Sequence, residues 1–349
     1  MIKSHVKKIV DRCFAEGVKL GHWSEAASGR YTIEVPKREG QGDFSTNFAL
    51  VAAGVDKRKP RDLAAQFAEL LGSQPMIDRV EIAGPGFINL FLDKNIWATV
   101  LAPIYEQGDR FGCSDAGAGR KVLVEFVSAN PTGPLSVGHG RNAVLGDAIA
   151  RVLAASGYAV QREYYFNDAG RQMRVLGEST KARYLERLGL PNDFPEDGYQ
   201  GDYIYDIAQA MIDEGGDSFK DSDVAVFKNR AQQAIFADID ATLKRIGIGF
   251  DTYFNEHTLY EDGRITQVVE DLRAKDLVYE KEGAVWFKTS EFGQEQDRVI
   301  IKSTGEPTYR LPDIAYHLDK FERAYDWMIN VFGSDHIDPV PDVMARIRA

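Results

Sequence analysis

Hydrophobic and polar positions divide the chain into three stretches that differ in their periodicity. The first stretch, to about residue 108, mixes helical spacing of apolar residues with short alternating runs. Predicted helices cover 2–18, 47–55 and 61–71, and predicted strands cover 31–35 and 87–92, the last after the turn 84–86. This pattern predicts a small α+β domain over residues 1–108. A glycine-rich hinge over 109–120 follows it.

The second stretch opens with an apolar run over 121–127, which is typical of a buried strand. A polar turn, a predicted helix over about 138–156 and a predicted strand over 159–166 come next. Strand, turn, helix and strand in this order form the first βαβ unit of a parallel sheet. We therefore predict an α/β fold with a Rossmann-like domain over residues 121–349.

The third stretch, about 190–290, starts with acidic and proline-bearing sequence and then becomes helical. We interpret it as an insertion into the parallel sheet. After it, the α/β pattern resumes with a strand over 298–302, a helix over 313–323 and a strand over 327–332.

The charge of the chain is uneven, and this limits the choice of partner. The net charge is −11, yet residues 1–61 carry 12 Lys/Arg against 7 Asp/Glu, and residues 190–240 carry 3 against 12. Overall acidity argues against a general nucleic-acid coat protein. A local basic region is nevertheless enough to attract RNA, because phosphate attraction is screened within about 8 Å at physiological salt.

Cysteine and hydrophobicity patterns narrow the class of protein further. The two cysteines, Cys13 and Cys113, have no CxxC partner, and no HExxH pattern is present. This excludes a disulfide framework and a cysteine-based zinc site, and it predicts a cytoplasmic protein. No apolar run reaches the roughly 18 residues of a membrane span, so we expect no membrane partner.

The segment most informative about chemistry joins the predicted strand to the predicted helix. Its residues are Ala129, Asn130, Pro131, Thr132, Gly133, Pro134, Leu135, Ser136, Val137, Gly138 and His139, followed by Gly140. A helix start favours phosphate, glycines there admit a close ligand, and His139 adds a donor. A capped helix with a solvent-facing histidine explains the same residues equally well. The fingerprint of a Rossmann dehydrogenase is absent, because its third glycine position is Ala143.

Together with the strand before it, this segment resembles the HIGH region of bacterial arginyl-tRNA synthetases. Further stretches resemble the same family in the same order: 42–47, 84–89, 162–172, 309–317 and 329–336. The resemblance implies a class I synthetase catalytic domain preceded by an additional domain that contacts the tRNA elbow. It further implies ATP-dependent formation of arginyl-adenylate and transfer to tRNA(Arg). ATP carrying Mg²⁺, no tightly bound protein metal, and a monomer are expected.

The resemblance also implies roles for individual residues. Glu125, Ser128, Asn130, Tyr309 and Asp313 are expected to bind arginine, whose guanidinium is best recognised by carboxylates. Catalytic roles fall on His139 and Ser136. The ATP-binding residues are expected to be Pro134, Gly138, His139, Gly140, Asp335 and His336. For Asp313, a helix-capping role after Pro312 is the alternative.

Two departures from the family pattern affect these expectations. Ser136 stands where the HIGH motif normally begins with histidine. Neither a KMSKS-type loop nor an anticodon-binding domain occurs before Ala349, so we expect a C-terminally truncated synthetase that charges tRNA poorly. A non-catalytic tRNA-binding module is one alternative. Another class I synthetase, such as the cysteine or methionine enzyme, is a second, although a cysteine–histidine metal cluster is missing.

Overall fold

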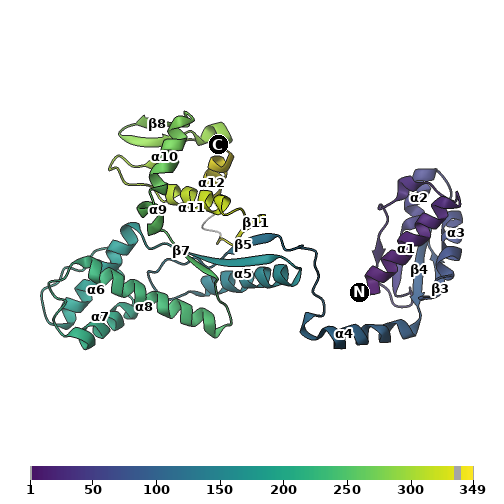
Figure 1. Cartoon of the computed structure of the whole chain (residues 1–349), viewed down its shortest axis with the longest axis horizontal. Coiled ribbons are helices and arrows are strands. Elements are labelled where there is room, and N and C mark those ends of the chain that lie inside the picture. The colour runs from purple at the N-terminus through teal and green to yellow at the C-terminus, as the bar shows by residue number, and fades with distance from the viewer. Residues whose placement is uncertain (1, 334–338, 349) are drawn as a thin grey trace. The chain divides into compact units, whose positions relative to one another are not determined.

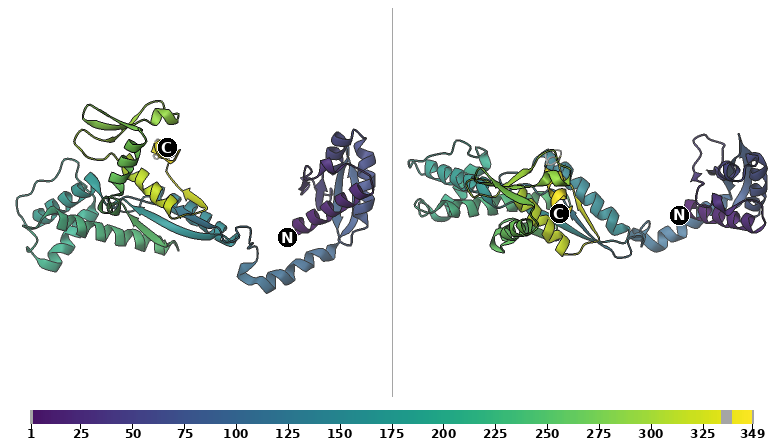
Figure 2. Two further views of the ribbon diagram at one scale, coloured as in Figure 1. Left: turned by 45° about the horizontal axis from the view of Figure 1, so that its top comes forward. Right: turned by 90° about the horizontal axis from the view of Figure 1, so that it is seen from above.

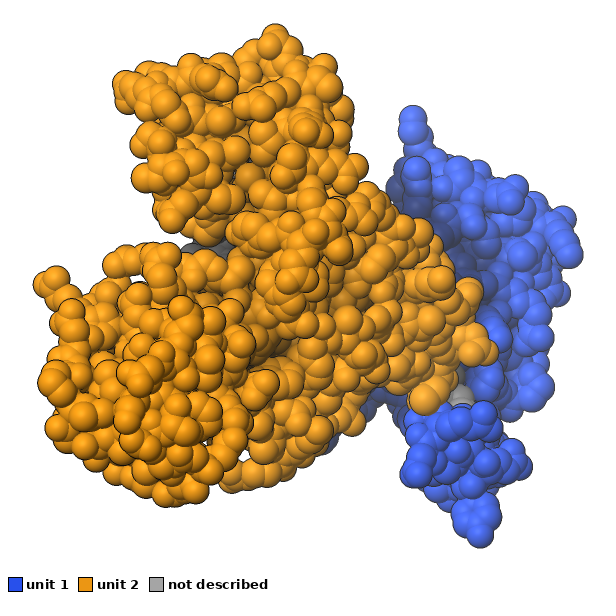
Figure 3. Space-filling view, turned by 60° about the vertical axis from the view of Figure 1, so that its left-hand side comes forward, with its two compact units in different colours: residues 1–111 blue, residues 112–349 orange. Residues whose placement is uncertain are grey.

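The computed structural model describes residues 2–333 and 339–348 (Figures 1 and 2). Contacts between residues divide the chain into two compact units, Met1–Phe111 and Gly112–Ala349. Figure 3 colours these two units separately. Each is described by itself below.

Unit 1 is an antiparallel sheet covered by helices. The sheet has the order β1-β2-β4-β3, with β1 at Ile33–Glu34, β2 at Phe44–Thr46, β3 at Ile77–Ala83 and β4 at Phe87–Leu92. Its helices are α1 (Ile2–Lys19), α2 (Phe48–Asp56), α3 (Pro60–Gly72) and α4 (Leu101–Gln107). α2 and α3 pack on the sheet, and α1 packs on α3. The predicted helix over 2–18 and the predicted strand over 87–92 are confirmed.

Unit 2 is built on a parallel sheet of order β11-β5-β6-β7. Its strands are β5 (Lys121–Glu125), β6 (Ala159–Phe166), β7 (Thr252–Asn255) and β11 (Trp327–Asn330). α5 (Val137–Ala155) connects β5 to β6, as the βαβ pattern predicts. Between β6 and β7 lie α6 (Gly170–Arg187), α7 (Asp202–Gly215) and α8 (Val224–Arg245). The predicted α/β fold with a parallel sheet is confirmed.

A second, antiparallel sheet lies between β7 and β11 in the sequence and has the order β10-β9-β8. Its strands are β8 (Val278–Lys281), β9 (Ala284–Phe287) and β10 (Arg298–Ile301). The helices around it are α9 (His257–Glu261), α10 (Arg264–Ala274), α11 (Arg310–Glu322) and α12 (Pro339–Arg348). Strand β7 falls inside the interval 190–290 and pairs in parallel with β6. The parallel sheet therefore runs through the interval 190–290, which the sequence pattern predicts to be an insertion.

The carboxyl ends of the four parallel strands meet at one edge of the sheet, where ligands bind in open α/β folds. In the register of the strands, Glu125 lies beside Asn330 on one side and beside Glu163 on the other. A row of polar side chains thus crosses three neighbouring strands close to this edge. Within the part of the chain that the structure describes, no helix has the length and apolar character to cross a membrane.

Candidate active site at the carboxyl edge of the parallel sheet

The turn that leaves β5 has an unusual backbone. Val127 and Ser128 have φ angles of 66° and 42°, in the left-handed region that β-branched residues rarely adopt. The turn is held by the Val127 N–H, which donates to Asn142 Oδ1 at 2.7 Å. It directs Ser128 back to the sheet, where its Oγ donates to Glu125 Oε1 at 3.0 Å and accepts the Tyr165 N–H at 3.1 Å. Such strained turns persist where the surroundings fix them, and they cluster at functional sites.

Glu125 is a buried carboxylate with a buried cation beside it. Its side chain is 5% exposed and that of Lys320 is 0% exposed, and Lys320 Nζ donates to Glu125 Oε2. Lys320 Nζ also donates to Asn330 Oδ1 at 2.7 Å. Burial raises the pKa of Glu125, but the Lys320 ammonium, together with His317 and the Ser128 hydroxyl, leaves the pKa below its ordinary value. Glu125 is therefore ionised at neutral pH.

Asp313, in the first turn of α11, has a different environment. Burial, followed by the nearby carboxylates of Glu256 and Glu125, raises the pKa of Asp313 to about 7. Among the described residues, its carboxylate has no hydrogen-bond partner. The helix-capping alternative is wrong, because α11 begins at Arg310 and Tyr309 is its N-cap residue. Asp313 is thus a half-buried carboxylate whose pKa is raised although the charges of Lys320 and Arg310 lie nearby.

Tyr309 precedes Asp313 by one helical turn. Its side chain is exposed, and the Arg310 guanidinium carbon lies 4.8 Å from the centroid of its ring. The backbone N–H of Asp313 approaches the Tyr309 carbonyl oxygen at 3.5 Å, so the two residues share the start of α11.

Several residues that the sequence analysis did not single out contact these groups and hold them in place. Tyr165 donates its hydroxyl to Glu256 Oε2 at 2.7 Å, and its ring packs on that of Tyr316 with centroids 4.3 Å apart. Tyr316 donates to Glu163 Oε1 at 2.7 Å, and Arg323 binds both oxygens of Glu163. One signal could have pointed to Glu163: it is a carboxylate inside a predicted buried strand, as Glu125 is.

The remainder of the strand-to-helix turn is tied to β6 and to the helices that follow it. Asn130 Nδ2 donates to Gln172 Oε1 at 2.8 Å, and the Tyr164 hydroxyl donates to the Ala129 carbonyl oxygen at 2.9 Å. Asn130 therefore lies at the carboxyl edge, with its amide oriented by α6.

Ser136 and His139 form a reciprocal cap at the start of α5. The His139 N–H donates to Ser136 Oγ at 3.4 Å, and the Ser136 N–H donates to His139 Nδ1 at 3.1 Å. Because Nδ1 accepts this hydrogen bond, the ring proton of neutral His139 lies on Nε2. The capping residue is a serine, which is well suited to this position. Ser136 is thus a structural cap as well as a candidate catalytic residue.

The glycines at the start of α5 lie in open space. A Cβ built on Gly140 would meet no atom within 4 Å, and one on Gly138 would meet only Ser136 Oγ at 3.5 Å. Internal packing therefore does not require glycine at either position, and a ligand has room to approach the backbone. Pro134 is exposed in the same turn. Asp335 and His336, the other two predicted ATP-binding residues, lie outside the described residues.

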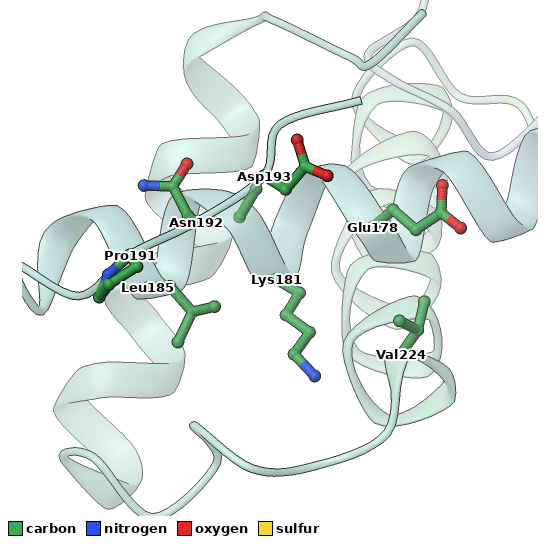
Figure 4. Close-up of a pocket in the computed structure, with 8 residues that line it drawn as sticks. Glu178, Lys181, Leu185, Pro191, Asn192, Asp193 and Val224 are labelled. Carbon is green, nitrogen blue, oxygen red and sulfur yellow. The ribbon is translucent and has the colours of Figure 1, made fainter. Parts of the chain in front are cut away.

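A surface depression near α6 and α8 (Figure 4) is lined by Glu178, Lys181, Asn192, Asp193 and apolar neighbours. Lys181 Nζ already donates to the Ser222 carbonyl oxygen at 2.7 Å, and none of the predicted site residues lines the depression. Among the described residues, no group of three or more His, Cys, Asp or Glu side chains is arranged to hold a metal ion.

Comparison with known proteins explains why these residues occur together. A family profile described as tRNA synthetases class I (R), catalytic domain, matches residues 104–338, and one described as arginyl tRNA synthetase N terminal domain matches residues 1–92. The chain belongs to the arginyl-tRNA synthetase family. The family resemblance of the sequence is thereby confirmed, and both Glu125 and Asp313 fall within the matched catalytic domain.

Curated relatives and solved structures agree with this family assignment. Arginine–tRNA ligase of Desulfotalea psychrophila is 62% identical over 351 residues, which cover 100% of this chain and 64% of the relative. The ligase of Salinibacter ruber is 50% identical over 90% of this chain and 60% of the relative. This family member thus spans about 64% of the length of the Desulfotalea protein.

A Campylobacter jejuni structure described as an arginyl-tRNA synthetase has a TM-score of 0.68 and 34% identity over 74% of this chain and 57% of that chain. The synthetase of Thermus thermophilus shares the fold, with a TM-score of 0.57 at 22% identity over 91% of this chain and 53% of that chain.

Proposed function

We propose that this family member takes part in arginine–tRNA ligation, by binding L-arginine and ATP at the carboxyl edge of the parallel sheet. The observation that carries the proposal is the half-buried Asp313 carboxylate, whose pKa is raised to about 7 and which forms no hydrogen bond with a described residue. A carboxylate that is partly withdrawn from water without a hydrogen-bonded cation is costly, and a cationic ligand offsets that cost. Arginine supplies a guanidinium, and the family of the chain supports this choice of substrate.

Within the arginine site, we assign the guanidinium to Asp313, with Tyr309 beside it. Glu125, Ser128 and Asn130 are assigned to the amino-acid end of the substrate. Glu125 Oε1 accepts only the Ser128 hydroxyl among the described residues, so one lone pair of that oxygen is free for the substrate ammonium. Ser128 and Asn130 lie next to it in the strained turn. Glu125 would then bind the ammonium of arginine, and Asp313 would bind its guanidinium.

ATP is assigned to the start of α5, where Pro134, Gly138 and Gly140 leave room for the nucleotide. In the reaction, a carboxylate oxygen of arginine forms a bond to the α-phosphorus, and the bond from that phosphorus to the bridging oxygen of pyrophosphate breaks. His139 presents Nε2–H as a donor for the charge that develops on the α-phosphate. Ser136 holds this histidine in place. Mg²⁺ would arrive on the ATP phosphates, and Asp335 and His336 remain ATP-binding candidates by resemblance.

The third substrate in the proposal is tRNA(Arg), whose terminal adenosine would accept the arginyl group. The excess of Lys and Arg in residues 1–61 suits contact with the tRNA backbone. We retain residues 1–108 as the tRNA-elbow domain, 109–120 as a hinge and 121–349 as the catalytic domain. A cytoplasmic monomer is part of the same proposal.

Calorimetry with matched ligands tests the arginine site directly. L-citrulline has nearly the shape of arginine but carries no guanidinium charge, so it should bind at least tenfold more weakly, because Asp313 gains no charge-assisted hydrogen bonds from it. Asp313→Asn should abolish this preference, whereas Asp276→Asn, at a side chain that is 95% exposed, should preserve it. Equal binding of arginine and citrulline, or no binding of either, would contradict the proposed site. Binding of tRNA(Arg) alone would instead favour the non-catalytic tRNA-binding module.

A further inference from the structure

A chain of hydrogen bonds connects α11, β11 and β5 behind the proposed arginine site. Lys320, in the third turn of α11, donates to Glu125 and to Asn330 Oδ1. Asn330 Nδ2 lies 3.1 Å from His317 Nε2, and His317 Nδ1 lies 2.8 Å from the carbonyl oxygen of Asp313. The chain therefore begins at one proposed arginine-binding carboxylate, Glu125, and ends at the backbone of the other, Asp313.

Chemistry allows only one order of donors and acceptors along this chain. Lys320 can only donate, so Asn330 turns its oxygen to Lys320 and its NH₂ group to His317. His317 Nε2 then accepts, and the proton on Nδ1 is donated to the Asp313 carbonyl oxygen. Burial and the neighbouring Lys320 charge lower the pKa of His317, which agrees with a neutral ring. Reversal of any one link would leave a buried polar group unpaired, so the three elements are held in one arrangement.

The balance of charge gives Lys320 a further role. Lys320 is fully buried and adjoins Glu125, whose side chain is only 5% exposed. Without Lys320, the buried Glu125 carboxylate would lose the cation that pairs with it, and its repulsion with the nearby Asp313 carboxylate would favour protonation of one of the two. Because Lys320 pairs directly with Glu125, Asp313 is the carboxylate left available for the cation of a ligand.

We propose that Lys320 is a positioning residue of the arginine site: it fixes Glu125 directly, and through Asn330 and His317 it fixes the first turn of α11, which carries Asp313. This role rests on the proposed function, since it concerns the same site. Lys320 acts through other residues and is not itself assigned a contact with substrate. A purely structural ion pair is the alternative, and it would stabilise the fold without a particular effect on arginine.

The decisive experiment measures the dissociation constants of L-arginine and of ATP for the full chain by calorimetry, in wild type and in variants. Lys320→Met should weaken arginine binding at least tenfold and change ATP binding by less than twofold. Asn330→Ala keeps the ion pair but breaks the link to His317, and it should weaken arginine binding about threefold to tenfold. Lys244→Met is the matched control, because this lysine pairs with Asp240 on α8 and its side chain is 68% exposed. It should change neither constant.

The double variant Glu125→Gln, Lys320→Met tests whether Lys320 acts through Glu125. Because part of its effect passes through Glu125, the loss of arginine affinity in the double variant should be smaller than the product of the two single-variant losses. Fold-losses that multiply would show an independent role and overturn the proposal, as would unchanged arginine binding in both Lys320→Met and Asn330→Ala. If Lys320→Met fails to fold by circular dichroism, Asn330→Ala and the double variant decide. If the wild-type protein binds no arginine, the proposed function fails, and the role of Lys320 fails with it.

Discussion

The two compact units bury different kinds of side chain. In unit 1, the described core consists of aliphatic side chains around a group of aromatic rings, with Phe48 and Phe67 at a centroid distance of 4.0 Å and Trp23 edge-on to Phe48 at 4.9 Å. Among its described residues, the buried polar ones are the uncharged Thr46 and Asn89. In unit 2, several charged groups are buried close to the carboxyl edge of the sheet: Glu125, Glu163, Asp168, Glu256 and Lys320.

This difference shows where the fold keeps buried charged groups that lower its stability but can serve ligand binding. Aromatic packing stabilises a domain without reference to any ligand. Buried charges stabilise less than apolar groups of similar volume, and they are justified when they specify an arrangement or bind something. The buried charges of unit 2 lie at the edge where the parallel strands end. The described interior of unit 1 buries no charged residue, so its side chains serve the stability of the domain. The predictions below test this contrast.

The largest expected effect comes from the core of unit 1. Phe48→Ala should lower the free energy of unfolding of unit 1 by about 3–5 kcal/mol, because it leaves a cavity among fully buried rings. Hydrogen exchange followed by mass spectrometry on the full chain can measure the protection of the backbone amides in each unit separately. Phe87→Ala, at a side chain that is 42% exposed in the same unit, is the control and should cost far less. A loss of protection in unit 2 of equal size would show that the units do not unfold independently.

In unit 2, the corresponding test removes a charge instead of a ring. Arg323→Met should destabilise unit 2 by about 2–3 kcal/mol, because it leaves the fully buried Glu163 without its cation. The expected cost lies below that of a completely buried pair, since the Arg323 side chain is 26% exposed. Adding Glu163→Gln to this variant should recover part of the loss, which urea denaturation can measure. No recovery in the double variant would mean that packing, and not charge, accounts for the cost.

Asp313→Asn should stabilise the protein at high pH while it weakens arginine binding. The pKa of Asp313 is raised to about 7 in the folded state, so between about pH 4 and 7 the folded protein holds a proton that the unfolded chain has lost. The free energy of unfolding therefore falls as pH rises through this window. The destabilisation caused by the ionised Asp313 reaches its full size above about pH 7. Asp313→Asn should remove about 1–3 kcal/mol of this cost at pH 8 and have little effect at pH 4.

The ligand-binding side of this prediction has the opposite sign. Arginine affinity in the wild type should increase as pH rises through about 7, because the guanidinium needs the ionised Asp313 carboxylate. Calorimetry in two buffers of different ionisation enthalpy should show the release of up to one proton on binding near pH 6. An arginine affinity independent of pH from 5 to 8 would rule out Asp313 as the titrating partner.

The sequence predicted the architecture better than the interior of the site. Periodicity predicted the parallel β5–α5–β6 unit, because a buried strand, a glycine-bearing turn and an apolar-periodic helix leave few other arrangements. The predicted roles of Glu125 and Asp313 in binding arginine stay predictions, although both residues lie at the expected edge. The connection between Lys320 and Glu125 could not be read from the sequence, because 195 residues separate them and only the pairing of β11 with β5 brings α11 to this edge.

The smallest expected effect concerns the start of α5. Ser136→Ala removes the side-chain acceptor of the reciprocal cap, so unit 2 should lose about 1 kcal/mol of stability. Ser136→Thr keeps a hydroxyl at the cap and is the matched control. The more specific measurement is ¹⁵N NMR of the His139 ring, where the wild type and Ser136→Thr should show the proton on Nε2. Because the Ser136 N–H bond to His139 Nδ1 depends on the capped geometry, Ser136→Ala should allow the proton to exchange between both nitrogens. An unchanged tautomer in Ser136→Ala would show that the backbone alone holds His139, and that the serine hydroxyl contributes only to helix stability.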